Sequence, residues 1–300
     1  MHKSIAMLKD AVAGKTYDAI AAEHGITRTA VERRVKNMAR TINRDVGIAG
    51  LNRNGVGFVQ RLRKAGPAVL AAIARYSPIV ARDPRSGGVL TDKEIEFAVN
   101  RTRARGTSPR RDVALFYALL VTGARPLEIA RMEVRDYLSE DGSVREESSM
   151  RKEVAINGNA RPLFFASQKA IASIDDYLAE RVRQGFGTGA PACYRGLDPD
   201  SRLFLGENGS PFEIVRYGEP GQARFLCRGI LEVYRRIFRH IDLDGLSALT
   251  LRRTVAFRMH ERGAAENQIG ELLGISEMTS VREMLSDARR PLRVLVRELV

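Results

Sequence analysis

The stretch LFYALLVTGARPLEIARMEV, residues 115–134, is the most informative in the chain. It begins with an apolar run typical of a buried helix, continues through a Thr-Gly turn and places Arg125 at the start of a second helix. Backbone amides at a helix start, together with a guanidinium group, form a site for an anion. A structural ion pair between Arg125 and Glu128, one helical turn further on, accounts equally well for the same residues.

Two later stretches of the sequence are informative together with residues 115–134. LTLRRTVAFRMHERG, residues 249–263, places Arg252 and Arg253 on a helix. LLGISEMTSVREML, residues 272–285, predicts two short helices hinged at Gly274, the second of which is amphipathic. An arginine on such a helix is typical of a phosphate contact.

The segments around these stretches predict a mainly helical chain with one small sheet. Residues 143–165 contain an Asn-Gly turn between short extended runs, which predicts a β-hairpin or a three-stranded sheet. Residues 168–184 predict a helix, and residues 185–222, rich in Gly and Pro, predict loops. Thr91, followed three residues later by Glu94, is typical of a capped helix start.

Taken in order, TGARPLEIARM, a hairpin carrying Lys152, LTLRRT and LLGIS resemble the catalytic domain of tyrosine recombinases, the phage integrases. The resemblance covers about residues 90–290. LTDKEIEFAV is similar to the entry helix of that family, and SRLFLGENGSPF to the segment before its second arginine. The resemblance implies a mainly α fold with a small antiparallel β-sheet.

In the family that the chain resembles, two arginines bind the scissile phosphate and stabilise its developing charge. A hairpin lysine assists the leaving oxygen, histidines transfer protons, and a tyrosine attacks to form a covalent DNA intermediate. By position, the resemblance assigns the two arginines to Arg125 and Arg252 and the lysine to Lys152. Arg253 stands where the family has a histidine and adds a charge that does not depend on pH, so we expect a phosphate clamp of these four residues.

The chain departs from the family at the residues that carry the chemistry. Leu249 stands where the family has a histidine three residues before the second arginine, and Ile275 where it has His or Trp. The nucleophilic tyrosine is expected at Met284, and no tyrosine follows Tyr234. Methionine has no nucleophilic oxygen, so we expect no DNA cleavage by this chain and do not expect an enzyme.

The three substituted positions are expected to be core residues that fill a former polar pocket. Ile275 and Met284 should then be largely buried, while Arg125 and Arg252 converge on one basic surface. A domain of this kind would keep its phosphate contacts, which position a protein on duplex DNA, without the chemistry.

The segment TYDAIAAEHGITRTAVERRVKNMA, residues 16–39, matches the spacing of a helix-turn-helix. Gly25 lies where the turn needs a positive φ, Ala21 is small where the helices cross, and Thr27 caps the second helix. The residues expected to point inward are Ile20, Ile26, Val31, Val35 and Met38. The residues expected to contact DNA are Arg28, Thr29, Arg33, Arg34 and Lys36. A plain helical hairpin with a solvated basic face is the alternative.

The charge of the chain favours a polyanionic partner. The formal net charge is +13, and residues 1–90 contain 16 Lys and Arg against 6 Asp and Glu, which leaves 33 against 30 in the remainder. Nucleic acid is the commonest partner of such a protein. The arginine usage of a GC-rich genome is the alternative explanation of the high basic content.

Other classes of protein are not favoured. Two cysteines, Cys193 and Cys227, are too few for a disulfide framework or a zinc site, so we expect no metal or cofactor. The N-terminal MHKSIAMLKD is interrupted by charges, and no apolar run reaches the length of a membrane helix. These features predict a cytoplasmic, nucleoid-associated bacterial protein with no membrane partner.

Together these features predict three segments: a helical helix-turn-helix domain at 1–76, a linker at 77–89 and a catalytically degenerate, tyrosine-recombinase-like domain at 90–300. The expected function is sequence-specific binding of double-stranded DNA by a transcriptional regulator, of the kind that mobile genetic elements carry. A non-catalytic partner subunit of a site-specific recombination complex is the first alternative, and an architectural DNA-bending protein is the second. A homodimer on DNA and an active recombinase are both open as partners, and the apolar stripe of residues 288–300 packs either within the chain or on a neighbouring subunit.

Overall fold

The computed structural model describes residues 2–49, 51, 57–76, 88–190, 192–219 and 224–286. Most of the predicted linker and the whole tail 288–300 lie outside the described residues. By its contacts the chain divides into two units. The N-terminal unit comprises residues 1–79 and 96–107, and the C-terminal unit comprises residues 80–95 and 108–300. The predicted boundaries at 76 and 90 stay a prediction.

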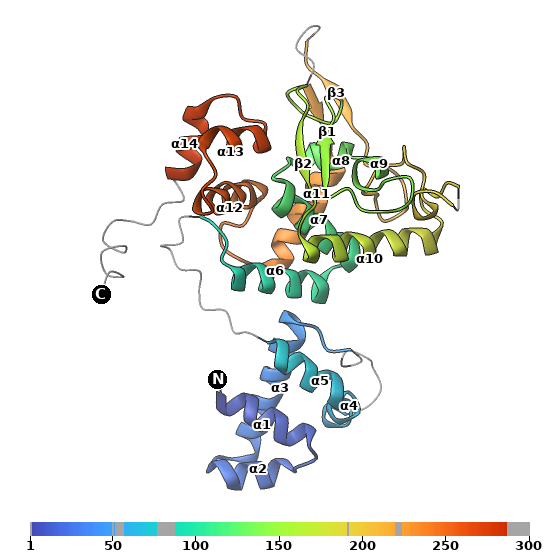
Figure 1. The fold of residues 1–300 in the computed structure, drawn as a ribbon. Coiled ribbons are helices and arrows are strands. Elements are labelled where there is room, and N and C mark those ends of the chain that lie inside the picture. Colours follow the sequence, from blue (N-terminus) through green and yellow to red (C-terminus); the bar gives the residue numbers. More distant parts are fainter. Residues whose placement is uncertain are drawn as a thin grey trace. The chain divides into compact units, whose positions relative to one another are not determined.

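The N-terminal unit is helical in its described part (Figure 1). Its helices are α1 (His2–Val12), α2 (Tyr17–His24), α3 (Arg28–Asp45), α4 (Phe58–Lys64) and α5 (Gly66–Arg75). α1 packs against α2, α3, α4 and α5, and α5 also packs against α3. Pro67 lies at the start of α5, because its fixed φ suits the first turn of a helix.

The α2–α3 pair follows the local signals in its sequence. Gly25 ends α2 in the left-handed region at φ 64°, and the Thr27 hydroxyl accepts a hydrogen bond from the Ala30 amide at 3.3 Å. Four of the five side chains expected to point inward are buried, and Ile26 is half-buried against the same core. Whether this pair contacts DNA stays a prediction.

Helix α6 (Asp92–Arg105) begins as predicted. The Glu94 carboxylate accepts a hydrogen bond from the Thr91 amide at 2.8 Å, and the Thr91 hydroxyl accepts one from the Glu94 amide at 3.3 Å. This reciprocal pair satisfies two amide donors that the first turn of a helix leaves without a partner.

The C-terminal unit is built around α7 (Pro109–Thr122). Residues 111–119 of this helix are buried on every side, because α8, α10, α11 and α12 pack against it. The other helices of the unit in its described part are α8 (Pro126–Arg131), α9 (Val134–Tyr137), α10 (Gln168–Gln184), α11 (Arg228–Ile241), α12 (Ala248–Glu261), α13 (Glu266–Leu273) and α14 (Met278–Ser286), with a 3-10 turn at Tyr194–Gly196. The predicted helix 168–184 is confirmed by α10.

Two short antiparallel hairpins complete the unit. β1 (Glu147–Met150) pairs with β2 (Arg161–Phe164), with Glu147 opposite Phe164 and Met150 opposite Arg161. β3 (Val215–Tyr217) pairs with β4 (Arg224–Leu226). The prediction of loops throughout 185–222 is wrong at β3, because three residues are too few for a periodic pattern. The predicted class, mainly α with a small antiparallel sheet, is confirmed.

Helices α12, α13 and α14 form a subsidiary apolar core, and Figure 1 shows them grouped together at the red end of its colour scale. Its buried members are Val255, Ala256, Ile269, Leu272, Leu273, Val281 and Leu285. Gly274 ends α13 at φ 63°, which confirms the predicted hinge between α13 and α14. Within the described residues, every helix is too short or too polar to cross a membrane.

A candidate anion-binding pocket in the C-terminal unit

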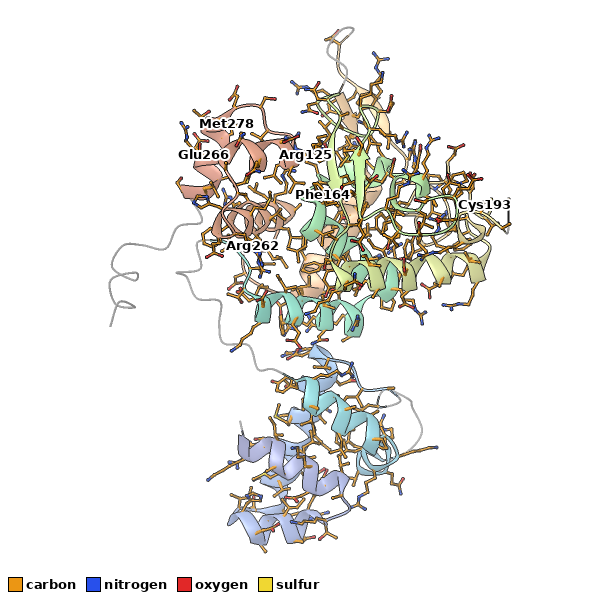
Figure 2. All side chains as sticks on the ribbon, in the orientation of Figure 1. Arg125, Phe164, Cys193, Arg262, Glu266 and Met278 are labelled. Atoms are coloured by element: carbon orange, nitrogen blue, oxygen red, sulfur yellow. The ribbon has the colours of Figure 1, made fainter. Side chains whose placement is uncertain are left out.

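A pocket of about 560 Å³ lies where the start of α8, the first turn of α12 and the α13–α14 turn meet. Arg125 and Arg252 both line it, which confirms that the two arginines converge. Figure 2 shows Arg125 in the region between α13 and the β1–β2 hairpin. The remaining lining residues are Pro126, Ala248, Leu249, Gly274, Ile275, Ser276, Glu277, Ser280 and Met284.

Arg252 is the fixed member of the pair. Its side chain is buried, one guanidinium nitrogen donates to the carbonyl of Gly123, and the other donates to the carbonyl of Leu273 at 3.0 Å. These carbonyls lie at the C-terminal ends of α7 and α13, where helices present acceptors without a partner. Burial and the nearby charge of Arg125 lower the pKa of Arg252 to about 10, so the group stays charged at neutral pH.

Arg125 is the available member of the pair. It is half-buried and precedes α8, and its backbone amide donates to a Glu128 carboxylate oxygen at 2.8 Å. Its guanidinium makes no hydrogen bond or ion pair with any residue that the structure describes. Its charge is therefore not neutralised inside the described part of the protein and can act on a ligand in the pocket.

Glu128 pairs with a different arginine. Arg161 of β2 donates to both carboxylate oxygens of Glu128, at 3.0 and 2.7 Å, and both side chains are buried. The predicted alternative, an ion pair between Arg125 and Glu128, is therefore wrong. Burial raises the pKa of Glu128, but the Arg161 ion pair and two backbone donors outweigh it and hold the pKa below its ordinary value.

Arg161 connects the walls of the pocket, and the sequence patterns did not indicate it. Besides binding Glu128, its Nε donates to the carbonyl of Leu272 at 3.1 Å, so one side chain links β2, α8 and the end of α13. A signal was present, because Arg161 and Leu163 are two positions apart on a short strand and therefore share its buried face. An arginine on the buried face of a strand needs an acidic partner.

The three substituted positions all line the pocket, yet they do not fill it. Ile275 and Met284 are half-buried against the core of α12, α13 and α14, and Leu249 is 49% exposed. The expectation of a core residue is therefore wrong for Leu249, whereas Ile275 and Met284 pack against that core as partly buried side chains. Leu249 lies in the first turn of α12, where the buried face is formed by Leu251 and Arg252 instead.

The other two members of the predicted clamp are elsewhere. The side chain of Lys152 is 75% exposed, lies 4.0 Å from the Glu153 carboxylate and does not line the pocket. Arg253 follows Arg252 on α12 and therefore points about 100° away around the helix. It lies near Gly88 rather than in the pocket. The predicted clamp of four residues is thus reduced to Arg125 and Arg252.

The polar side chains of the pocket are few. Ser276, Glu277 and Ser280 line it beside the two arginines, and Glu277 is the only acidic residue among the described lining residues. The same set contains no histidine, tyrosine, cysteine or lysine. Its formal charge, two arginines against one glutamate, favours an anion.

The predicted DNA-contacting residues lie on α3 of the other unit. Arg33 and Arg34 are exposed and make no ion pair with a described residue. Arg28 lies 3.5 Å from Asp18, and Lys36 lies 2.6 Å from Glu32 within the same helix. Thr29 is exposed. Of the five, Arg33 and Arg34 therefore present the least compensated charges.

In the described part of the chain the cysteines form no disulfide, and the cysteines and acidic residues form no group suited to a metal ion. Cys193 and Cys227 are free thiols, and Figure 2 shows Cys193 at the right-hand edge of the unit, away from Arg125. No group of three or more His, Cys, Asp or Glu among the described residues is arranged to hold a metal ion.

No family model matches the chain, and no curated protein matches it. Several solved structures, however, are similar to the chain. The crystal structure of XerA recombinase is 14% identical over 97% of this chain and 96% of that chain, with a TM-score of 0.48. The XerH site-specific recombinase bound to a palindromic difH substrate is 14% identical over 88% of this chain and 70% of that chain, with a TM-score of 0.47. The Tn1549 transposon integrase in complex with circular intermediate DNA is 14% identical over 95% of this chain and 98% of that chain, with a TM-score of 0.45. The solved structures to which this chain is similar are thus tyrosine recombinases and integrases.

Proposed function

We propose that the chain binds double-stranded DNA in a sequence-specific manner as a transcriptional regulator and does not cleave the DNA. One observation carries the proposal: a single pocket contains both arginines that the sequence motifs nominate and all three positions at which the reactive groups are replaced. The pocket can therefore hold a phosphate, but it lacks the tyrosine and the histidines to which the resemblance assigns the attack and the proton transfer.

The two arginines suit a phosphate contact in different ways. Arg252 is held in place by two backbone carbonyls, and these bonds use two of its five N–H donors. Arg125 brings a charge that no described residue compensates. A DNA phosphate between them would gain charge-assisted hydrogen bonds, which supply affinity and position the protein without selecting a base sequence.

Strand cleavage would need an activated nucleophile. The hydroxyls in the pocket are those of Ser276 and Ser280, and a serine attacks a phosphate only when a base removes its proton. Among the described lining residues there is no histidine to act as that base. We therefore expect no covalent DNA adduct on a nicked suicide substrate, either for the wild type or for Ser280→Ala.

Sequence selection is assigned to α3. Its exposed Arg33 and Arg34 can reach base edges in the major groove, which is the usual route to specificity for a helix of this kind. Residues 1–90, which include α3, also carry most of the surplus positive charge of the chain.

The proposal is tested with a DNA site selected from a random pool, with binding followed by fluorescence anisotropy between about 50 and 300 mM salt. Arg125→Gln should weaken binding to the selected site and to scrambled DNA by similar factors and should reduce the salt slope by about one. Arg110→Gln is the matched control, because Arg110 is exposed, is paired with Asp176 and Glu180 and does not line the pocket. Equal binding by wild type and Arg125→Gln at every salt concentration would contradict the proposal.

The open pocket also favours a second candidate, a non-catalytic subunit of a site-specific recombination complex. A pocket that is open rather than packed shut can still receive a phosphate beside an active recombinase. The two candidates are separated by mixing the chain with an active recombinase and a suicide substrate, in parallel with a transcription reporter. If recombination requires this chain while transcription of the reporter does not respond to it, the transcriptional-regulator candidate is excluded.

A further inference from the structure

The pocket contains more apolar surface than a phosphate contact uses. Pro126, Leu249, Ile275 and Met284 form this surface, contributed by α8, α12, the α13–α14 turn and α14. A DNA phosphate and its hydration shell leave such side chains in contact with water, which is unfavourable for hydrocarbon.

Leu249 is the most exposed part of this surface. Nearly half of it is accessible, although it stands beside two arginines on the wall of a pocket. Met284 is half-buried in another wall, and a methionine side chain adapts readily to the shape of a bound group. The two side chains together offer a place for a hydrocarbon chain next to a charged end.

The size of the pocket also exceeds what a phosphate group requires. Its volume is about 560 Å³ in a depression that is largely open to solvent, and small-molecule sites likewise combine mostly apolar walls with a few polar groups that orient the ligand. Here the orienting groups are Arg125, which lacks a side-chain partner among the described residues, and Arg252, which is held in place.

We propose that this pocket binds a small amphiphilic anion: an anionic oxygen head group between Arg125 and Arg252, with a hydrocarbon body against Leu249, Ile275 and Met284. The inference rests on the proposed function in one respect, because such a ligand would occupy the arginines that are assigned to a DNA phosphate. Binding of the ligand would then weaken binding of DNA, and the pocket would act as an effector site.

The test uses the chain of 300 residues and three probes: inorganic phosphate, hexyl phosphate and hexanoate. Binding is followed by calorimetry and by the methyl signal of Met284 in carbon-13 spectra. Hexyl phosphate should bind about tenfold more tightly than inorganic phosphate, because its chain leaves water. Whichever of hexyl phosphate and hexanoate binds more tightly identifies the preferred head group, phosphate or carboxylate.

Two variants assign the two halves of the ligand. Leu249→Ser should reduce the preference for hexyl phosphate over inorganic phosphate severalfold. It should not disturb folding, since Leu249 is 49% exposed. Arg125→Gln should weaken all three probes. Equal affinity for hexyl phosphate and inorganic phosphate, or a preference unchanged in Leu249→Ser, would overturn the inference.

A DNA-binding arm separates this inference from the proposed function. If Arg125→Gln abolishes hexyl phosphate binding but leaves DNA binding unchanged, the proposed function fails and the ligand pocket stands. If DNA binding depends on Arg125 but hexyl phosphate binds no more tightly than inorganic phosphate, the inference fails and the proposed function stands. Hexyl phosphate should weaken DNA binding by the wild type more than by Leu249→Ser.

Discussion

At the scale of single residues, the pocket depends on which charges are paired. Arg161 neutralises Glu128 and holds the carbonyl of Leu272, so the walls of the pocket are joined by one buried side chain. Arg125 has no ion-pair partner among the described residues because Glu128 is already satisfied by Arg161 and by backbone amides. The pocket is therefore positively charged because the Glu128–Arg161 ion pair, which lies outside the pocket, removes the acidic partner that Arg125 would otherwise have.

Glu277 opposes that positive character. We expect Glu277→Gln to strengthen DNA binding by about 1.4- to fivefold at low salt, because an exposed charge of this kind contributes about 0.2–1 kcal/mol. The gain should disappear at high salt as the charge is screened. Glu283→Gln is the control, because Glu283 is an exposed acid of α14 that does not line the pocket. An equal gain in both variants would show a general charge effect instead.

The Glu128–Arg161 pair should be essential to stability. Arg161→Met leaves a buried carboxylate without its partner and should lower the free energy of unfolding by about 3–5 kcal/mol, as measured by urea unfolding at pH 7. Glu128→Gln combined with Arg161→Met should recover part of that loss. A cost below about 1 kcal/mol would mean that the pair is not needed.

The same pair predicts a pH dependence. The pKa of Glu128 is lower in the folded chain than the unfolded value of about 4.3. Its stabilising contribution is therefore complete above that unfolded value and is lost as the pH falls through the lower folded value. Arg161→Met has already lost this contribution, so its destabilisation relative to the wild type should shrink between pH 7 and about pH 3, as measured by urea unfolding. The same cost at both pH values would contradict this.

At the scale of elements, left-handed glycines at the ends of helices set where the chain turns. Gly25 and Gly123 have nearly the same φ, 64° and 60°, but different surroundings. A Cβ at Gly25 would meet nothing within 4 Å, whereas a Cβ at Gly123 would overlap the side chain of Leu273. Gly123 also supplies a carbonyl to Arg252, so its turn belongs to the pocket.

Alanine at these two glycines should separate backbone strain from steric overlap. Gly25→Ala should cost about 1 kcal/mol, because only the left-handed conformation is penalised. Gly123→Ala should cost about 1–3 kcal/mol in addition, because Leu273 must move. It should also weaken binding of phosphate probes, which Gly25→Ala should not do. Equal thermal unfolding of the two variants would contradict the steric explanation.

At the scale of the whole molecule, the proposed function divides affinity and specificity between the two units. Most of the surplus charge lies in residues 1–90, while the pocket that holds Arg125 belongs to the C-terminal unit. Each unit has its own core, so a substitution on the surface of one should leave the packing of the other intact.

This division predicts different effects of two substitutions. Arg34→Ala should change which sequence is preferred in a random-pool selection, whereas Arg125→Gln should lower affinity without changing the preferred sequence. Their effects on the binding free energy should add to within about 0.5 kcal/mol in the double variant, because the sites share no partner. An unchanged preferred sequence in Arg34→Ala would remove α3 from sequence selection.

Features that depend on near neighbours along the chain could be predicted from the amino-acid sequence. The extent of α10, the cap formed by Thr91 and Glu94 and the turn at Gly25 were all predicted, because a helix and its ends are specified by residues within a few positions. The order of the motifs also nominated the positions that line the pocket. The order of the motifs predicts which positions line the pocket, because the conformation of each motif is set by residues within that motif.

How distant segments meet could be learned only from the folded chain. Arg161 rather than Arg125 pairs with Glu128, and Arg252 is held by the ends of two helices. Leu249 and Met284 line an open pocket instead of closing it. Charge and periodicity do not specify which of several arginines reaches a given carboxylate, or whether apolar walls touch, because both depend on how elements far apart in the chain pack together.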